Sequence, residues 1–484
     1  MVNTWLSDPP ADGSIALPRD ISAAATALRA GAVTSRELTR TALAAADAVD
    51  GELGSYLCRL DEFALAAADR ADAELAAGRD RGPLHGIPLA VKDTISTAAA
   101  PTTAQSTVLD PAWGAGRDAP VVARLLAAGA VLTGKTTTME FACGMPESGG
   151  PFPVPRNPWD LGAWPGGSSS GSAAGVAAGL FLAALGSDTI GSVRIPAAMC
   201  GVTGLMPTFG RVPKSGCVPL AFSVDRVGPV ARSAADCALV LEAIAGQAPE
   251  DPDSVDAPFA ALDVGDLAGL RVGVVRREAL PEGADPSVAP AFDAAVAELS
   301  RLGLDCVEVE LPRYAEMTAA DIVTVLCEAL AYHRPDLGGR WPQYTRGTRG
   351  LLLRAAMLSG ADYVQAQRVR RAGQLDLERL FTRVDVVVMP TLSITAPALE
   401  GFLTGERDVF ELFGHFHTVY WNAAGGPALA LPMGVSAGGL PLSVQLAGRP
   451  FSDETLLRIG AAFQDRTEHH LRRPALAAEE RTRP

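Results

Sequence analysis

One stretch of this 484-residue chain restricts the fold more than any other, because it contains no charged side chain from Leu161 to Ser187. It starts as a glycine- and serine-rich loop (166–172), continues as an alanine- and glycine-rich run, and is followed by a further serine, Ser192, next to a glycine. We expect such a segment to be buried, and a buried hydroxyl group is costly unless it finds a hydrogen-bond partner. The sequence therefore predicts a polar cluster around these serines.

The lysines indicate what completes that cluster. Only three of the 41 basic residues are lysines, namely Lys92, Lys135 and Lys214. Arginine keeps its proton in proteins, whereas a buried lysine can lose its proton and act as a base. Lys92 ends the short apolar segment 86–91, a setting in which an amine becomes desolvated. A surface lysine at the end of a strand is the alternative interpretation.

The composition is that of an ordinary globular protein, with 48% hydrophobic and 20% charged residues. The net charge of −14 argues against nucleic-acid binding. The first residues lack the pattern of a secretory signal, and the longest apolar run, 173–185, is too short to span a membrane. The seven cysteines form no CxxC pair, which is typical of small buried side chains in a reducing compartment. We therefore expect a cytoplasmic protein that binds neither nucleic acid nor membrane.

Helical and strand patterns alternate along the chain, which favours an α/β fold with a large mixed sheet and helices on both faces. We expect a single domain over residues 1–484. The expected helices are 20–48 (broken at Gly31, with a capping box at Thr34 and Glu37), 61–77, 119–128, 285–302, 317–332, 361–381 and 452–466. The expected strands are 87–91, 130–133, 271–275, 304–310 and 385–390, together with 427–433 paired to 441–447.

Two familiar motifs match the sequence but lack the surroundings that their function needs. Residues 129–136 fit the phosphate-binding loop GxxxxGK[ST], yet a helix and then a strand are expected here, with no helix opening at Lys135. Residues 167–171 fit the GxSxG nucleophile elbow, yet no β-branched strand precedes them. We therefore expect neither nucleotide binding nor an α/β-hydrolase elbow.

The sequence gives little support for a catalytic triad or a zinc site built on histidine. The chain has six histidines, and His415, His417, His469 and His470 lie in no context that suggests a catalytic triad. The adjacent pair His469 and His470 lacks a Cys or Glu partner at zinc-ligand spacing. We expect no metal site.

A lysine and serines on glycine-rich loops remain. A neutral lysine can accept a proton through one hydroxyl group and so activate another, in place of the histidine of the usual triad. The glycine beside Ser192 would let successive backbone N–H groups point at one oxygen, as in an oxyanion hole. The alternative is a glycine-rich turn before a helix, and these residues taken singly leave both interpretations open.

Taken together, the motifs resemble the amidase signature family of serine hydrolases. The resemblance extends from about residue 20 to residue 466. The matching segments are 86–106, 134–144, 156–179, 186–208, 210–236, 385–391 and 425–463. The resemblance implies the amidase signature fold, with a signature core at about 85–236, and no metal or organic cofactor.

The resemblance also implies a catalytic role for each matching residue. Ser192 would be the acylating nucleophile, and Lys92 would be the neutral base. Ser168 would be the bridging serine that relays protons between them, on a cis peptide bond after Gly167. The backbone N–H groups implied to hold the oxyanion belong to Thr189, Ile190, Gly191 and Ser192. The residues implied to support the site through hydrogen bonds are Ser169, Asp188 and Arg194.

Three residues depart from the family pattern. Ile190 stands where the family usually has glycine, and a β-branched residue fits a positive φ poorly. We therefore expect Ile190 to keep an ordinary backbone conformation. Ser170 replaces a usual glycine and Met206 a usual lysine, but neither coincides with the three proposed catalytic side chains.

The expected substrate is a small amide or carbamate (urethane) with an apolar or aromatic acyl group, and a urea-type substrate is an alternative. The variable region at about 313–360 is expected to help close the pocket, and the protein is expected to act as a monomer or homodimer. The side chains expected at the pocket are Met139, Phe141, Met145, Phe152 and Trp421.

Two other functions stay open. One is the glutaminase subunit of a tRNA-dependent amidotransferase, although such subunits tend to carry Gln-Pro where this chain has residues 194–196, Arg-Ile-Pro. The other is a non-catalytic scaffold of the same fold, against which the intact set of one lysine and two serines argues.

Overall fold

Eleven strands form one sheet in the computed structural model, which describes residues 17–259, 262–474 and 476. Their order across the sheet is β1-β3-β2-β4-β6-β5-β10-β11-β9-β7-β8. The strands are β1 (Tyr56–Arg59), β2 (Pro88–Lys92), β3 (Val131–Thr136), β4 (Ala183–Asp188), β5 (Thr203–Met206), β6 (Arg226–Ala231), β7 (Arg271–Val274), β8 (Asp305–Glu308), β9 (Val386–Pro390), β10 (Ala428–Val435) and β11 (Pro441–Gly448).

The sheet is mixed, as the sequence predicts. β2 runs parallel to β3 and β4, and β7 runs parallel to β8 and β9. The other neighbouring strands are antiparallel, including the predicted pair β10 and β11, which starts with Ala428 opposite Ala447. Parallel strands need helical crossovers, and the alternating helix and strand patterns of the sequence supply them.

Helices cover both faces of the sheet, as predicted. None of the helices in the described ranges is long and apolar enough to cross a membrane. The α-helices are α1 (Ile21–Arg29), α2 (Ser35–Leu53), α3 (Asp61–Ala76), α4 (Pro120–Ala127), α5 (Ser170–Ala178), α6 (Arg194–Cys200), α7 (Ala234–Ile244), α8 (Val288–Arg301), α9 (Tyr314–His333), α10 (Leu337–Arg340), α11 (Arg346–Ala355), α12 (Gly360–Leu380), α13 (Glu400–Thr404), α14 (Val419–Ala424) and α15 (Asp453–Thr467). The short 3₁₀ turns are η1 (Glu140–Ala142), η2 (Trp341–Gln343), η3 (Val409–His415) and η4 (His469–Leu471).

Neighbouring strand residues point to opposite faces of the sheet and so enter different cores. Leu89 of β2 packs in the core beneath α1, α4, α7, α8 and α15. The next residue, Ala90, packs on the other face with α5 and α6. The small side chain of Ala90 leaves room there for the closely packed helix that carries the serine-rich loop.

Helix α5 explains why the serine-rich segment contains only small residues. All nine of its residues are buried, as the absence of charge predicts. A Cβ atom added to Gly171 would collide with the backbone oxygen of Ser55 and with Thr137. A Cβ atom added to Gly175 would collide with the ring of Phe181. The segment therefore packs as an interior helix whose N-terminus lies at the candidate site.

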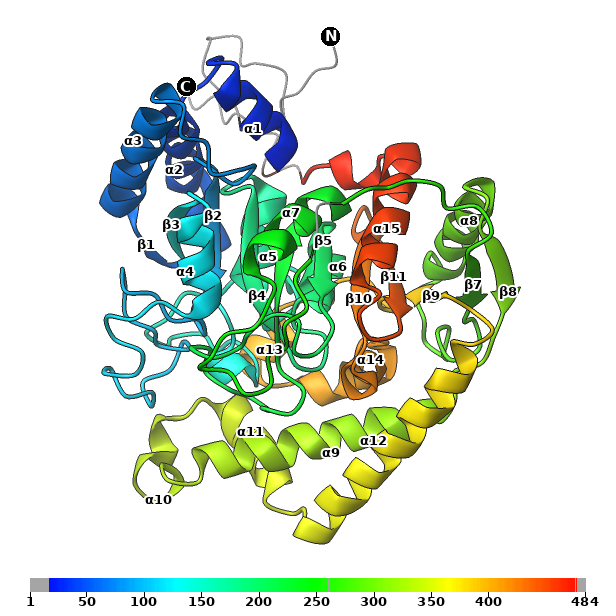
Figure 1. Ribbon diagram of the computed structural model, residues 1–484. Helices are drawn as coiled ribbons and strands as arrows, with labels where there is room; N and C mark the ends of the chain where they lie inside the picture. The colour runs from blue at the N-terminus through cyan, green and yellow to red at the C-terminus, as the bar shows by residue number, and fades with distance from the viewer. Residues whose placement is uncertain (1–16, 260–261, 475, 477–484) are drawn as a thin grey trace.

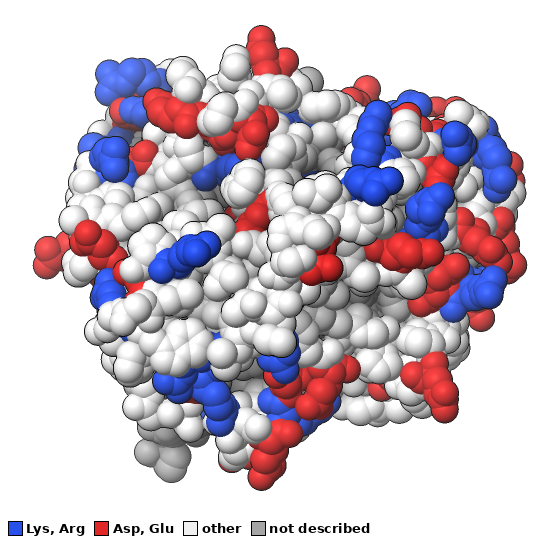
Figure 2. Space-filling view, turned by 90° about the horizontal axis from the view of Figure 1, so that it is seen from below, with Lys and Arg blue, Asp and Glu red and all other residues white. Residues whose placement is uncertain are grey.

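Helices α9 to α12 lie together below the sheet in Figure 1. Figure 2 shows the molecule from that side, where positive and negative side chains are interspersed. This face therefore carries no extended area of one charge sign. The helices belong mainly to the region between residues 313 and 383, and two of them, α9 and α11, contribute to the candidate site below.

Several elements differ from the expectation. β3 continues to Thr136, beyond the predicted end at residue 133. This extension is possible because its polar residues find buried hydrogen-bond partners. Thr136 Oγ1, for example, lies 2.8 Å from Ser172 Oγ. Strands β1, β4, β5 and β6 were not predicted, because these segments of four to six residues contain no run of alternating apolar and polar residues. Of the seven cysteines, all of them free, three are buried as expected and four are partly exposed.

Candidate active site

Lys92 ends β2 with its side chain fully buried. Its amine nitrogen lies 2.7 Å from the Oγ atom of Ser168 and 2.9 Å from the Oγ atom of Ser187. The apolar strand residues before it carry the amine into the interior, as the sequence predicts for a desolvated lysine. The alternative of a surface lysine is therefore wrong.

Burial also changes the protonation of Lys92. Desolvation lowers its pKa to about 7, because water cannot stabilise the charged form, while the electrostatic effects of Cys217, Asp188 and Asp225 act in the opposite direction. A lysine with this pKa exchanges its proton readily near neutral pH. It can therefore serve as a general base, which an arginine at the same position could not do.

The loop before α5 brings Ser168 to this amine. The peptide bond between Gly167 and Ser168 is cis, as the family resemblance implies. The next residue, Ser169, connects this loop to the loop of Ser192. The backbone N–H of Ser169 donates to the Ser192 carbonyl across 3.0 Å, and the Ser169 hydroxyl donates to the Ser187 carbonyl across 3.2 Å. Both proposed catalytic serines are buried, and both line one cavity. No hydrogen bond joins their hydroxyl groups directly in the described structure.

Asp188 organises the loop that leads to Ser192. Its carboxylate accepts hydrogen bonds from the backbone N–H of Gly191 at 2.9 Å and of Val193 at 3.2 Å. Arg194 donates to the same carboxylate through Nε and Nη2, both at 3.0 Å, and to Asn422 Oδ1 at 2.6 Å. Burial acts to raise the pKa of Asp188, but the ion pair with Arg194 and these hydrogen bonds lower it below its usual value. Asp188 and Arg194 are thus placed to support the loop.

One member of the expected oxyanion hole is already engaged. The N–H of Gly191 donates to Asp188, so it cannot also donate to a substrate oxygen in this arrangement. Among the described residues, the N–H groups of Thr189, Ile190 and Ser192 make no hydrogen bond within the protein. These three donors remain available. The sequence could not show that the N–H of Gly191 is engaged, because this depends on where the Asp188 carboxylate lies in the folded loop.

Ile190 keeps an ordinary backbone conformation, as predicted. Within the described residues it is absent from the non-glycine positions that have a positive φ, and Gly191 takes φ 125° instead. The carbonyl of Ile190 accepts a hydrogen bond of 2.7 Å from Thr418 Oγ1. Its side chain packs between two apolar clusters and lines the cavity above the serines.

The cavity that Ser168 and Ser192 line has a volume of about 50 Å³. None of its lining side chains is charged. Its walls come from the Met139–Gly144 segment, from α9 and α11, and from η3 with Phe416 just after it. The lining residues are Met139, Ala142, Cys143, Gly144, Trp164, Gly167, Ser168, Ile190, Ser192, Ile195, Leu220, Val325, Leu351, Val409, Phe410, Phe413 and Phe416.

Of the five side chains expected at the pocket, only Met139 lines this cavity. Phe141 packs in the core against His333, with ring centroids 4.4 Å apart, and Trp421 packs against Tyr420 at 5.1 Å. Phe152 is partly buried outside the cavity. Met145 lines an adjoining groove of about 170 Å³, which shares Gly144, Leu351, Val409 and Phe410 with the cavity. Proximity in sequence to the signature motifs was therefore a poor guide, because the Phe141 side chain packs into the core while its neighbours Met139 and Ala142 line the cavity.

Sequence reasoning missed the aromatic side chains that cover the cavity and one serine beside Lys92. Phe410, Phe413 and Phe416 follow one another at three-residue spacing and cover the cavity, and their aromatic repeat in 410–416 was the available signal. Ser187 was also missed, although it immediately precedes Asp188. Its contact with Lys92 depends on the parallel pairing of β2 with β4, which the sequence did not reveal.

The lysine of the phosphate-loop motif has a structural role. Lys135 lies inside β3 instead of opening a helix, which confirms the expected order of elements. Its amine lies 2.8 Å from Asp93 Oδ1 and 2.6 Å from Thr102 Oγ1. Lys135 therefore has a carboxylate partner, whereas Lys92 contacts only hydroxyl groups.

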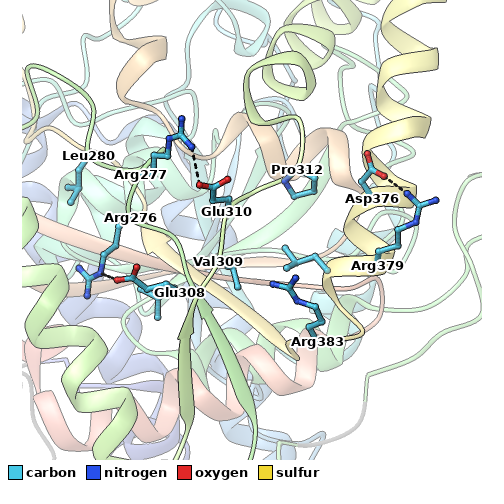
Figure 3. A pocket seen from close by; sticks show the side chains of 12 residues that line it. Arg276, Arg277, Leu280, Glu308, Val309, Glu310, Pro312, Asp376, Arg379 and Arg383 are labelled. Atoms are coloured by element: carbon cyan, nitrogen blue, oxygen red, sulfur yellow. Dashed lines mark hydrogen bonds and ion pairs between the residues drawn. The ribbon is translucent and has the colours of Figure 1, made fainter.

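A larger groove of about 890 Å³ lies away from these serines, between β7, β8 and α12. Figure 3 shows that its charged side chains face one another in pairs, with Arg383 lying outside them. Arg277 is 3.0 Å from Glu310, and Arg379 is 2.7 Å from Asp376. These pairs offer no nucleophile beside a base. Nor do the described residues contain a group of three or more His, Cys, Asp or Glu side chains that could hold a metal ion.

Comparisons with known proteins show the family of the chain. The A subunit of glutamyl-tRNA(Gln) amidotransferase from Chloroflexus aurantiacus is 41% identical to this chain over 94% of it and 98% of the relative. The peptide amidase of Stenotrophomonas maltophilia superposes with a TM-score of 0.81 at 32% identity, covering 94% of this chain and 98% of that one. The A subunit of glutamyl-tRNA(Gln) amidotransferase from Thermotoga maritima has a TM-score of 0.74 at 31% identity, covering 90% and 92%. The family model described as Amidase matches residues 37–457, and the chain therefore belongs to the amidase signature family.

Proposed function

We propose that this chain hydrolyses the C–N bond of small apolar or aromatic amides or carbamates, through an acyl-enzyme on Ser192. The observation that carries the proposal is the buried amine of Lys92, which lies 2.7 Å from Ser168, and Ser168 lines an uncharged cavity together with Ser192. A base, a relay and a nucleophile then meet at one place that excludes water.

In the acylation step, the neutral Lys92 accepts the proton of Ser168 while Ser168 accepts the proton of Ser192. The Ser192 oxygen forms a bond to the substrate carbonyl carbon, and the carbonyl oxygen becomes an oxyanion. The free N–H groups of the 189–192 loop stabilise that charge. When the C–N bond breaks, the proton on Lys92 returns through Ser168 to the leaving nitrogen, which departs as a neutral amine.

Deacylation repeats the sequence with water as the nucleophile. The relay removes a proton from water, the hydroxide oxygen bonds to the acyl carbon, and the bond between that carbon and the Ser192 oxygen breaks. Ser192 recovers its proton through Ser168. The products are the amine and a carboxylic acid, or a carbonic acid monoester when the substrate is a carbamate, and the three side chains return to their starting protonation.

The substrate class follows from the lining of the cavity. A charged substrate group would lose its hydration there and find no counter-charge, which costs several kcal/mol. Apolar and aromatic groups gain from burial instead. Because the cavity of about 50 Å³ is smaller than such a group needs, the phenylalanines of the 410–416 segment must move when a substrate enters.

A second candidate is the glutaminase subunit of a tRNA-dependent amidotransferase. The 41% identity to one amidotransferase subunit over nearly the whole chain favours it. Free glutamine carries an ammonium and a carboxylate group beside its amide, and the cavity lining offers neither a cation nor an anion to bind them. In this function the remaining subunits would be required partners.

The two functions are separated by assaying the purified chain alone and with the other amidotransferase subunits. The substrates are anilides, aliphatic primary amides, aryl carbamates and free glutamine. Hydrolysis of the apolar substrates by the isolated chain, with no turnover of glutamine, supports the main proposal. Glutamine turnover that appears only with the partner subunits supports the second candidate instead.

A further inference from the structure

A second buried carboxylate, besides Asp188, contacts the oxyanion loop. Oδ1 of Asp225 accepts a hydrogen bond of 2.7 Å from the hydroxyl of Thr189, the first residue of the loop. Oδ2 accepts the backbone N–H groups of Leu220 at 2.9 Å and Ala221 at 3.0 Å. Asp225 is only 8% exposed. The loop is therefore held by two interior carboxylates.

Asp225 also lies behind the proposed base. Ser187, which contacts the amine of Lys92, lines a small internal cavity of about 10 Å³ together with Thr189, Cys217 and Asp225. That volume is about the space of one water molecule. A polar path therefore leads from the amine through the Ser187 hydroxyl toward the Asp225 carboxylate.

The other ionisable groups near Lys92 are either ion-paired or uncharged at neutral pH. Asp188 is paired with Arg194, and Asp93 is paired with Lys135 at 2.8 Å. Burial raises the pKa of the Cys217 thiol to about 11, so it stays protonated at neutral pH. Asp188 and Asp225 both act electrostatically on the amine, and of these two carboxylates Asp225 is the one without an ion-pair partner among the described residues.

Two cations lie near Asp225 but are engaged elsewhere. Lys214 forms an ion pair with Asp253 at 2.5 Å, and Arg226 donates to the backbone oxygens of Val224 and Asn422, both at 3.2 Å. Among the described residues, no side chain forms an ion pair with Asp225 itself. Asp225 therefore has no ion-pair partner of its own there, although Lys214 and Arg226 line the same small cavity and Lys214 acts to lower the pKa of Asp225.

We propose that Asp225 is a positioning residue for this site: it holds Thr189 at the start of the oxyanion loop and supplies the negative charge that stabilises the protonated form of Lys92. This inference rests on the proposed function, in which Lys92 must become charged during each acylation. Burial disfavours the ammonium ion, and an unpaired carboxylate behind it offsets part of that cost. Burial also raises the pKa of Asp225 to about 6, which still leaves the carboxylate mostly ionised at neutral pH. The carboxylate thereby supports the step in which the proton reaches the amine.

The proposal is tested by the pH dependence of Ser192 labelling with a fluorophosphonate, which needs no knowledge of the substrate. Asp225→Asn can keep the same hydrogen bonds, with its amide oxygen toward the two backbone N–H groups and its NH₂ toward Thr189. Without the negative charge, the pKa of Lys92 falls. The midpoint of the labelling rate should then move to lower pH by roughly one unit, while the rate on the plateau decreases.

Substitutions of Thr189 distinguish the positioning role of Asp225 from the effect of its charge. Thr189→Val removes the hydrogen bond and keeps the carboxylate, so the plateau rate should fall several-fold while the midpoint moves less than in Asp225→Asn. Thr189→Ser restores the hydroxyl and should recover the rate. Asp453→Asn is the matched control, because Asp453 is a buried carboxylate that also accepts a threonine hydroxyl, from Thr208 at 2.6 Å, but lies on α15.

The outcomes distinguish this inference from the proposed function. If the wild-type chain is not labelled at Ser192, the proposed function itself fails. If the wild type is labelled but Asp225→Asn leaves the midpoint unchanged, or Asp453→Asn shifts it equally, the role of Asp225 is refuted. Should Asp225→Asn not fold, Asp225→Ser removes the same charge with less bulk and must move the midpoint in the same direction.

Discussion

Lys92 and Ser168 are hydrogen-bonded across 2.7 Å although neither side chain is more than 1% exposed. A second serine, Ser187, lies 2.9 Å from the same nitrogen. Only Ser168 also lines the cavity that contains Ser192. The amine therefore contacts one hydroxyl on the side of the nucleophile and one on the side away from it.

This arrangement predicts different results for two otherwise similar substitutions. Ser168→Ala breaks the path from Ser192 to the base and should lower kcat/KM by about 10³-fold, the usual range for losing a positioned proton-transfer group. Ser187→Ala removes a contact of nearly equal length and should cost less than about tenfold. The measurement is steady-state hydrolysis of an anilide by both variants. Equal losses would mean that Ser168 is no more a relay than Ser187.

Lys92→Arg should abolish most activity even though it keeps a positive charge. The guanidinium stays protonated at any pH that the protein tolerates, so it cannot accept the proton of Ser168. We expect a decrease in kcat/KM of about 10³-fold or more. Lys214→Arg is the matched control, because Lys214 pairs with Asp253 and donates to the Phe222 carbonyl, and an arginine can take over both roles, so the variant should retain near-normal activity. Substantial turnover by Lys92→Arg would contradict the assignment of Lys92 as the base.

Activity should rise with pH and reach a plateau above pH 8. Desolvation lowers the pKa of Lys92 to about 7, so the amine is protonated and inactive below that pH and neutral above it. This increase of activity with pH is opposite to what a catalytic ammonium group would give, because an enzyme that needs the protonated amine loses activity as the pH rises. The logarithm of kcat/KM measured between pH 5 and 9 should show one rising limb centred near pH 7. A midpoint close to 10 would indicate an exposed lysine.

Ile190→Ala should change which substrates are accepted more than how fast the best one reacts. The Ile190 side chain fills part of the cavity wall above Ser192, and its backbone is held independently by Thr418. Removing three carbon atoms enlarges a cavity of about 50 Å³, so the ratio of kcat/KM for naphthyl over phenyl anilides should increase about tenfold. The comparison variant is Val255→Ala, a substitution at an exposed surface residue that should leave the ratio unchanged. A lower ratio in Ile190→Ala would show that Ile190 does not limit the size of the substrate.

The sequence by itself determined the strands and helices with strong periodicity and the identity of the chemical groups. The apolar segment before Lys92 and the absence of charge around the serines already demanded burial, because exposed charges are what keep a segment at the surface. The resemblance to the family motifs then implied which residues would be the nucleophile, the relay and the base, and these roles stay predictions. These predictions depend on residue types, which the sequence states directly.

Only the tertiary structure decided which neighbours these groups meet. Ser187 reaches Lys92 because β2 and β4 pair in parallel, and Gly191 is lost as an oxyanion donor because Asp188 folds back over it. The cavity is covered by the phenylalanines of the 410–416 segment, more than 200 residues after the serines, and not by the nearer Phe141. Contacts between such distant segments depend on the packing of the whole sheet, which local sequence patterns do not encode.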